Sequence, residues 1–133
     1  LHILTTQVGN FNRTEALKVF TNILQTYGNK IDGVYGHSDE EGLAAIQAIR
    51  AAGGTPGNPI QIVSINGYKD AIKAVADGEI LAVVECSPFY GKTTFDTIEK
   101  WQKGEKLPEF IQNPGKVYDR SNAQQLYDAG EGF

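Results

Sequence analysis

The sequence predicts an α/β fold with a mostly parallel sheet. Short runs rich in β-branched residues alternate with amphipathic helical segments, and the loops between them are short. The chain has 133 residues, of which 41% are apolar and 21% charged. This length and composition suit one globular core and do not suit two.

The helical segments carry apolar residues at helical spacing. Leu17, Phe20 and Leu24 recur three and four residues apart, with Asn12 before them as a candidate N-cap and Gly28 after them as a stop. Together the patterns predict helices over residues 13–27, 39–52, 68–76 and 88–103, the last with Pro88 in its first turn.

The β-branched runs between these helices predict strands. IQIVSI, at residues 60–65, is the most apolar of them. The expected strands cover residues 1–6, 31–35, 60–65 and 80–85, with a further extended piece at 116–118. The rest of the chain after Pro108 is expected to be irregular, and residues 128–133 to be frayed.

Polar residues follow each predicted strand. In an open α/β sheet the ligand crevice lies beyond the carboxyl ends of the strands, so these residues are the site candidates. Few of them are charged, which suits a neutral polyhydroxyl ligand. They are Gln7, Asn10, His37, Ser38, Asp39, Asn66, Gly67, Glu85, Cys86 and Ser87.

The charge pattern argues against two classes of partner. The net charge is −4 with acids and bases interspersed, whereas nucleic-acid binders usually cluster basic residues on one face. With two histidines and one cysteine, a metal would need mainly carboxylate ligands. The one acidic cluster, Asp39 to Glu41, falls in the first turn of a predicted helix, where it complements the helix dipole. We expect no metal and no cofactor.

An enzymatic alternative rests on Cys86 and His37. Both follow predicted strands, so a nucleophile and its base could meet at the sheet edge. The simpler interpretation of Cys86 is a small, half-buried thiol at the end of a strand. The sequence has no CxxC, HExxH or phosphate-binding glycine motif. We therefore predict that the protein is not an enzyme.

Three segments, in the same order along the chain, resemble type I periplasmic sugar-binding proteins of ABC importers. They are ILTTQVGNFNRTEALKVFTNIL (3–24), GVYGHSDEEGLAAIQAIRAAG (33–53) and IQIVSINGYKDAIKAVADGEILAVVECSP (60–88). VECSP and the tail KVYDRSNA (116–123) look closest to galactofuranose-type members. The resemblance implies the C-terminal lobe of such a receptor, with a Rossmann-like sheet in the order 2-1-3-4-5.

The resemblance also implies the site. Two lobes of such a receptor close over a monosaccharide and hold its hydroxyls with polar side chains. Ser38 stands where the family has Asn, Asn66 where it has Asp, and Cys86 (or Ser87) at the hinge position, with His37 and Asp39 beside Ser38. Asn66 can donate as well as accept, so the pattern of ligand contacts should differ from that of an Asp.

The implied cellular role is capture of a sugar for an ABC permease in the membrane. The location would be the periplasm, or a lipid-anchored position outside a Gram-positive cell. The alternative is the effector-binding core of a LacI-type transcriptional regulator, which is built from similar lobes.

The resemblance further implies that part of the fold is supplied elsewhere. Residues 1–86 would form a partial C-terminal lobe, and residues 87–133 a hinge-crossing helix and tail that pack on an N-terminal lobe. A central strand, expected between the strands at 1–6 and 31–35, is missing. The sequence contains no methionine, which suggests a processed piece. We therefore expect an N-terminal polypeptide of the same precursor to complete the fold.

Overall fold

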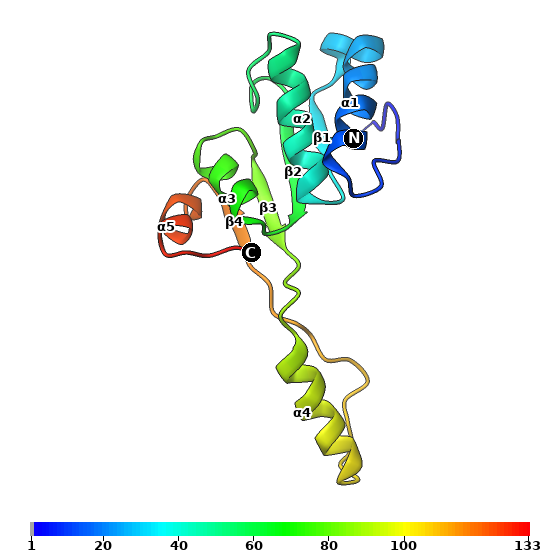
Figure 1. The fold of residues 1–133 in the computed structure, drawn as a ribbon, viewed down its shortest axis with the longest axis vertical. Coiled ribbons are helices and arrows are strands. Elements are labelled where there is room, and N and C mark those ends of the chain that lie inside the picture. The colour runs from blue at the N-terminus through cyan, green and yellow to red at the C-terminus, as the bar shows by residue number, and fades with distance from the viewer. Residues whose placement is uncertain (1) are drawn as a thin grey trace.

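The computed structural model describes residues 2–133 and has the expected strand–helix alternation (Figure 1). The elements are α1 (Arg13–Tyr27), the 3-10 helix η1 (Gly28–Lys30), β1 (Gly33–Tyr35), α2 (Asp39–Ala51), β2 (Gln61–Asn66), α3 (Lys69–Ala76), β3 (Ala82–Glu85), α4 (Gly91–Gln102), β4 (Val117–Asp119) and α5 (Ala123–Asp128).

The strands form a four-stranded sheet in the order β1-β2-β3-β4. β1 pairs with β2 and β2 with β3 in parallel, and β4 pairs with β3 in antiparallel register. Because α2 and α3 connect successive parallel strands, β1, β2 and β3 all run in the same direction. Their carboxyl ends therefore lie together along one side of the sheet, which is called the carboxyl edge below. The predicted α/β class with a mostly parallel sheet is confirmed.

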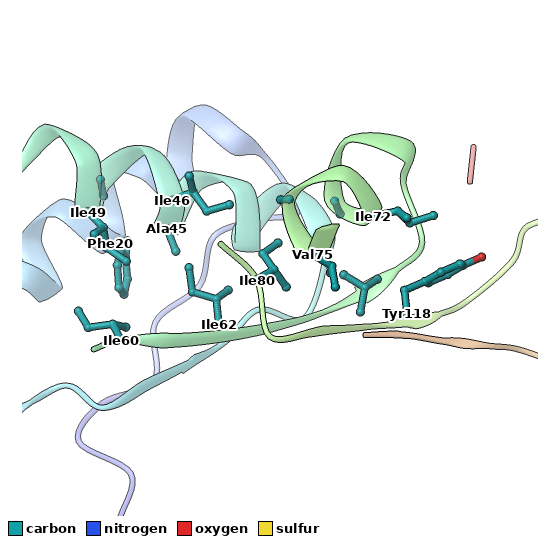
Figure 2. Packing of buried hydrophobic residues seen from close by; sticks show 14 of the residues in the cluster. Phe20, Ala45, Ile46, Ile49, Ile60, Ile62, Ile72, Val75, Ile80 and Tyr118 are labelled. Carbon is teal, nitrogen blue, oxygen red and sulfur yellow. The ribbon is translucent and has the colours of Figure 1, made fainter. Parts of the chain in front are cut away.

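The core lies between the sheet and the helices on one of its faces (Figure 2). Ile62 of β2, Val83 of β3 and Tyr118 of β4 point into it, and Ile72 and Val75 of α3 cover them. α1 reaches the same core through Phe20. The β-branched strands and the amphipathic helices thus bury the apolar faces that their sequence patterns predict.

The opposite face of the sheet is uncovered. Side chains alternate along a strand, so residues next to the core-facing ones point the other way. Tyr35, Val84 and Val117 are such residues, and all three are exposed. Within residues 2–133, β1 pairs only with β2, so its other edge carries free backbone donors and acceptors.

Side-chain caps explain where two helices begin. Asn12 Oδ1 accepts the Glu15 N–H at 3.0 Å before α1, and Ser38 Oγ accepts the Glu41 N–H at 3.3 Å before α2. α1 ends at Gly28, which has a φ of +51°. The predicted cap at Asn12 and stop at Gly28 are confirmed.

The structure corrects the predicted first strand and the predicted start of the last long helix. Residue 1 lies outside the described part of the chain, and residues 2–6 form no strand. A strand needs a hydrogen-bonded neighbour, and these residues have none in the sheet. Pro88 also lies outside the helix, because α4 begins at Gly91.

The tail is more ordered than its sequence predicts. The expected extended piece is β4, and α5 follows it. α5 packs on α3, with Ala123 buried and Leu126 and Tyr127 against the core. Phe133 O accepts the Lys69 N–H, so the last residues also contact α3. A six-residue helix has too short a periodic pattern to be recognised before these contacts are known.

α4 lies on an arm that projects away from the sheet (Figure 1). Two connecting segments lead to it and run side by side near the lobe, where the Glu85 N–H donates to Lys116 O at 2.8 Å. Farther out, Asn113 Nδ2 donates to Ser87 O at 3.3 Å. Lys116 is also tied to Glu131 of the lobe, and this hydrogen bond raises the pKa of the lysine. The predicted division into residues 1–86 and 87–133 stays a prediction. Within the second part, β4 pairs with β3 and α5 packs on α3, so both lie on the same lobe as residues 1–86.

Candidate functional site: the carboxyl edge of the parallel strands

The ends of β1, β2 and β3 bring three predicted site residues together. The side chain of Asn66, at the end of β2, accepts the Asp39 N–H at 3.2 Å. The main-chain oxygen of Asn66 accepts the Cys86 N–H at 2.8 Å, just beyond β3. Asn66 therefore joins the loop after β1 to the hinge segment after β3, and the three residues form a row along the edge.

Ser38 lies at the same edge and has a structural role there. Its hydroxyl oxygen caps α2, and the residue is buried. One oxygen lone pair is occupied by the Glu41 N–H, while the hydroxyl hydrogen has no partner in residues 2–133. Ser38 can therefore still donate a hydrogen bond to a ligand.

Asp39 is the most enclosed polar residue of the edge, with 0% of its surface exposed. Oδ1 accepts the Ser64 hydroxyl at 2.5 Å, and Oδ2 accepts the N–H groups of Gly67 at 2.8 Å and Tyr68 at 2.7 Å. These bonds tie the start of α2 to the loop after β2. Ser64 faces α2 from the sheet, which explains why a hydroxyl stands in an otherwise apolar core.

His37 is exposed and lies toward the uncovered face of the sheet. Its ring is 4.7 Å from the ring of Tyr35, and its backbone N–H donates to Glu41 Oε2 at 2.8 Å. In the described part of the chain no hydrogen bond joins His37 to Cys86, whose thiol is free and exposed.

An exposed aromatic residue, Phe11, was not among the predicted site residues. It precedes the cap of α1, so it lies at the same edge of the sheet, and its backbone has a φ of +52°. The turn that carries it rests against α2, because a Cβ added to Gly9 would lie 2.9 Å from Glu41 Oε1. The signal in the sequence was a phenylalanine between two polar residues at the start of a helix, where no core position is expected.

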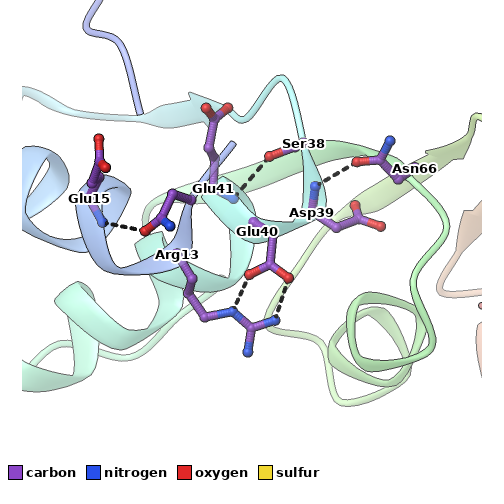
Figure 3. A network of polar contacts seen from close by, with 8 residues as sticks. Arg13, Glu15, Ser38, Asp39, Glu40, Glu41 and Asn66 are labelled. Carbon is purple, nitrogen blue, oxygen red and sulfur yellow. Dashed lines mark hydrogen bonds and ion pairs between the residues drawn. The ribbon is translucent and has the colours of Figure 1, made fainter. Parts of the chain in front are cut away.

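The helices on the covered side frame this edge with charge (Figure 3). Arg13 at the start of α1 pairs with Glu40 in the first turn of α2, with Nε 2.6 Å from Oε2. A hollow of about 300 Å³ lies beside this pair, lined by Arg13, Glu40, Tyr68, Lys69, Asp70 and Phe133. None of the predicted site residues lines the hollow, so the candidate site is the open edge itself and not an enclosed pocket.

The edge is suited to one kind of chemistry. The groups that Ser38 and Asn66 offer to a ligand are neutral, and the phenyl ring of Phe11 lies at the rim. Charge stands nearby at Glu85, the end of β3, and at the Arg13–Glu40 pair. Within residues 2–133, no group of histidine, cysteine, aspartate and glutamate is placed to hold a metal ion, and no helix is long and apolar enough to cross a membrane. Fold and edge together are typical of one lobe of an α/β ligand-binding protein.

Comparison with known families agrees with this class. The family described as periplasmic binding protein domain matches residues 1–106, and the chain belongs to this family. The galactofuranose-binding protein YtfQ of Escherichia coli (strain K12) is 38% identical over 111 residues, which are 82% of this chain and 35% of YtfQ. The fructose import binding protein FruE of Bifidobacterium longum is 30% identical over 127 residues, 95% of this chain and 38% of FruE.

Solved structures agree as well. The periplasmic binding protein of the arabinose ABC transporter from Shewanella sp. ANA-3, bound to α- and β-L-arabinofuranose, is 37% identical with a TM-score of 0.87; the match covers 96% of this chain and 43% of that one. A Mycobacterium smegmatis protein in complex with β-D-fucofuranose is 34% identical with a TM-score of 0.83, covering 95% and 41%.

These relatives confirm the predicted resemblance and the lobe-sized extent of the chain. YtfQ, FruE and the Shewanella protein are binding proteins, the latter two of transport systems, and the family is one of binding proteins and not of enzymes. The chain spans less than half the length of each of them. The alternative of a regulator core receives no support from these relatives and stays a prediction.

Proposed function

We propose that this chain forms one wall of the sugar site in a solute-binding receptor for an ABC importer. The observation that carries the proposal is that Asn66 joins the loop of Ser38 and Asp39 to the hinge at Cys86, with the Asp39 carboxylate already paired inside the chain. The groups that Ser38 and Asn66 can offer at this edge are neutral. A monosaccharide presents hydroxyls that both donate and accept. Neutral groups at a strand edge can match such hydroxyls without the cost of burying a charge.

Phe11 adds the apolar half of this wall. Its side chain is 69% exposed in a turn held in the left-handed region, an arrangement that costs free energy and buries nothing. A sugar ring has an apolar C–H face that an aromatic ring can cover. We assign to Phe11 the stacking contact with the sugar, and to Ser38 and Asn66 the hydrogen bonds to its hydroxyls.

The opposite wall and the missing parts of this lobe come from a further polypeptide segment. Three uncovered surfaces support this: the free edge of β1, the bare sheet face around Tyr35, and the apolar side of α4. The segment would add a strand beside β1 and a helical layer below the sheet. Closure of two lobes would bend the connecting segments near Cys86. The receptor would work in the periplasm, or lipid-anchored outside a Gram-positive cell, and deliver the sugar to a membrane permease.

The test is sugar binding by the complete receptor. Isothermal titration with D-ribose, D-fructose, L-arabinose, D-galactose and D-fucose should find at least one ligand. Asn66→Ala should weaken that ligand about tenfold, because it removes one hydrogen bond and leaves a ligand group unpaired. The proposal fails if none of these sugars binds, or if Asn66→Ala leaves the affinity of the bound sugar unchanged.

Ser38 needs two substitutions, because it both caps α2 and faces the ligand. Ser38→Ala removes the hydroxyl and destabilises the helix by about 1 kcal/mol, whereas Ser38→Gly removes the hydroxyl at a helix cost of only a few tenths. If the hydroxyl contacts the sugar, both variants lose affinity to the same extent. An affinity loss confined to Ser38→Ala would assign the residue to capping alone.

A further inference from the structure

Asp39 is a buried carboxylate whose hydrogen bonds are all satisfied inside the chain. It accepts from Ser64 on one oxygen and from Gly67 and Tyr68 on the other, and it is fully buried even though the edge around it is open. A ligand at the edge would therefore meet the groups around Asp39 and not its carboxylate. The two backbone donors follow Asn66 directly, so Asp39 holds the loop in which Asn66 is the first residue.

The same residue also fixes the amide of Asn66. The Asp39 N–H donates to Asn66 Oδ1 at 3.2 Å, and an N–H can be accepted by the oxygen of an amide but not by its nitrogen. This bond decides which way the amide is turned. Figure 3 shows the Asn66 nitrogen on the side away from Asp39. In residues 2–133, Asn66 Nδ2 donates no hydrogen bond.

The backbone of Asn66 shows that its position is imposed. Its φ is +152°, outside the range that L residues ordinarily adopt. The peptide unit that follows Asn66 is held at both of its polar groups: the Gly67 N–H donates to Asp39, and the Asn66 carbonyl accepts from the Cys86 N–H. The next N–H, of Tyr68, also donates to Asp39. Such a conformation persists only where the surrounding contacts define it, and here those contacts are the bonds to Asp39 and Cys86.

We infer that Asp39 is a positioning residue: its backbone N–H turns the Asn66 amide and its carboxylate holds the loop that carries Asn66. Position 66 then acts as a pure hydrogen-bond donor toward the ligand, so that the site selects a sugar oxygen able to accept there. The inference rests on the proposed sugar site. It adds the direction of one hydrogen bond: Asn66 presents its NH₂ group to the ligand, because its side-chain oxygen already accepts from the Asp39 N–H. A ligand that carries a protonated amine at this point would leave Nδ2 unpaired and facing a second donor, and the site should reject it.

The first experiment tests this direction in the complete receptor. The probes are the tightest-binding sugar of the five named above and its monoamino derivatives, one for each hydroxyl, at a pH where the amine is protonated. For one derivative, the unsubstituted receptor should bind about tenfold or more weaker than it binds the sugar. Asn66→Asp should reverse this preference at the same ring position, because one carboxylate oxygen keeps the Asp39 N–H and the other accepts from the amine.

The outcomes of this experiment separate the two proposals. The relevant quantity is the ratio of the dissociation constant for each amino derivative to that for the parent sugar. If the unsubstituted receptor binds a sugar but Asn66→Asp changes none of these ratios, the donor assignment is overturned and the sugar site stands. If none of the five sugars binds, the sugar site is overturned and the donor assignment falls with it.

The second experiment asks whether Asp39 acts through Asn66. In a double-mutant cycle on sugar affinity, Asp39→Asn should cost about tenfold when residue 66 is Asn and less than about twofold when it is Ala. Glu40→Gln is the matched control, because it makes the same change one residue along α2 at a carboxylate that pairs with Arg13 instead. It should leave the affinity unchanged in both backgrounds.

Equal losses for Asp39→Asn in both backgrounds would show a general effect on the fold and overturn the positioning role. Ser64→Ala is the milder second variant, since it removes one of the three donors to the Asp39 carboxylate. Ser64→Ala should lower the sugar affinity less than Asp39→Asn does, and again mainly when residue 66 is Asn. It replaces Asp39→Asn in the cycle if that variant does not fold.

Discussion

Two glycines with nearly the same backbone show how a single residue can be constrained by its neighbours. Gly53 and Gly57 have φ values of +80° and +77°. A Cβ added at Gly53 would meet nothing within 4 Å, whereas one at Gly57 would lie 2.2 Å from the carbonyl oxygen of Gly78. The left-handed backbone is common to both glycines. Comparing an alanine substitution at each of them therefore isolates the effect of the close approach between the turn at Gly57 and the turn at Gly78.

Alanine at these positions should therefore have unequal costs. Gly53→Ala should lower the free energy of unfolding by about 1–2 kcal/mol, the cost of a left-handed alanine. Gly57→Ala should lower it by about 1–3 kcal/mol more, because the turn at Gly78 has to move. Urea unfolding of the complete receptor measures both, and equal losses would show that the approach at Gly78 relaxes freely.

At the scale of elements, α4 is a helix without a core. Phe95 and Trp101 are 69% and 68% exposed, and Ile98 beside them is also exposed. The exposed ion pair between Lys92 and Asp96, at 2.5 Å, adds little. Helices of this length are marginal in water without packing, so the apolar side of α4 needs a partner surface.

Truncating this apolar side should weaken the association with the completing segment. Trp101→Ala should raise the dissociation constant by at least about thirtyfold, as expected for a buried aromatic anchor. Lys100→Ala, on the preceding residue of the same helix, is the matched control and should change it little. Titration of separately produced polypeptides gives both constants, and equal effects would place the partner surface elsewhere.

At the scale of the whole molecule, the uncovered parts of the sheet have a common explanation. Tyr35, Val84 and Val117 form a bare apolar face, and β1 has a free edge. Burying a valine or a similar side chain contributes about 1.5–3 kcal/mol, so an added layer would gain several such contributions. Pairing the edge of β1 would also satisfy its free backbone groups.

Residues 1–133 alone should therefore not behave as a well-folded monomer. Native mass spectrometry should find the isolated 14.5 kDa chain self-associated, and should find it bound to the completing segment once that segment is added. Hydrogen exchange at the amides of Gly33 to Tyr35 should slow when that segment is added, because the edge becomes paired. A stable monomer of 14.5 kDa, with slow exchange in β1, would contradict the proposed completion.

Most local elements, and the polar residues at the ends of the strands, could be predicted from the sequence. Helix periodicity located α1 and α2, with a cap at Asn12 for α1, and the apolar run at 60–65 located β2. These signals are local, since caps and periodic faces depend on residues a few positions apart. Strand–helix alternation then placed the polar residues at one edge of a parallel sheet.

How these residues are used depends on contacts between distant parts of the chain. Residues 2–6 have a strand-like sequence but no strand beside them, and α5 depends on contacts with α3 that its own six residues do not predict. From the sequence, Asp39 was expected in the first turn of a helix, where it complements the helix dipole, and the family resemblance placed it beside the ligand. Its burial and its bonds to Ser64, Gly67 and Tyr68 follow from contacts 25 to 29 residues away, which no local pattern contains. The sequence therefore predicted which polar groups line the edge, and the fold decided that Asp39 turns inward while Asn66 faces out.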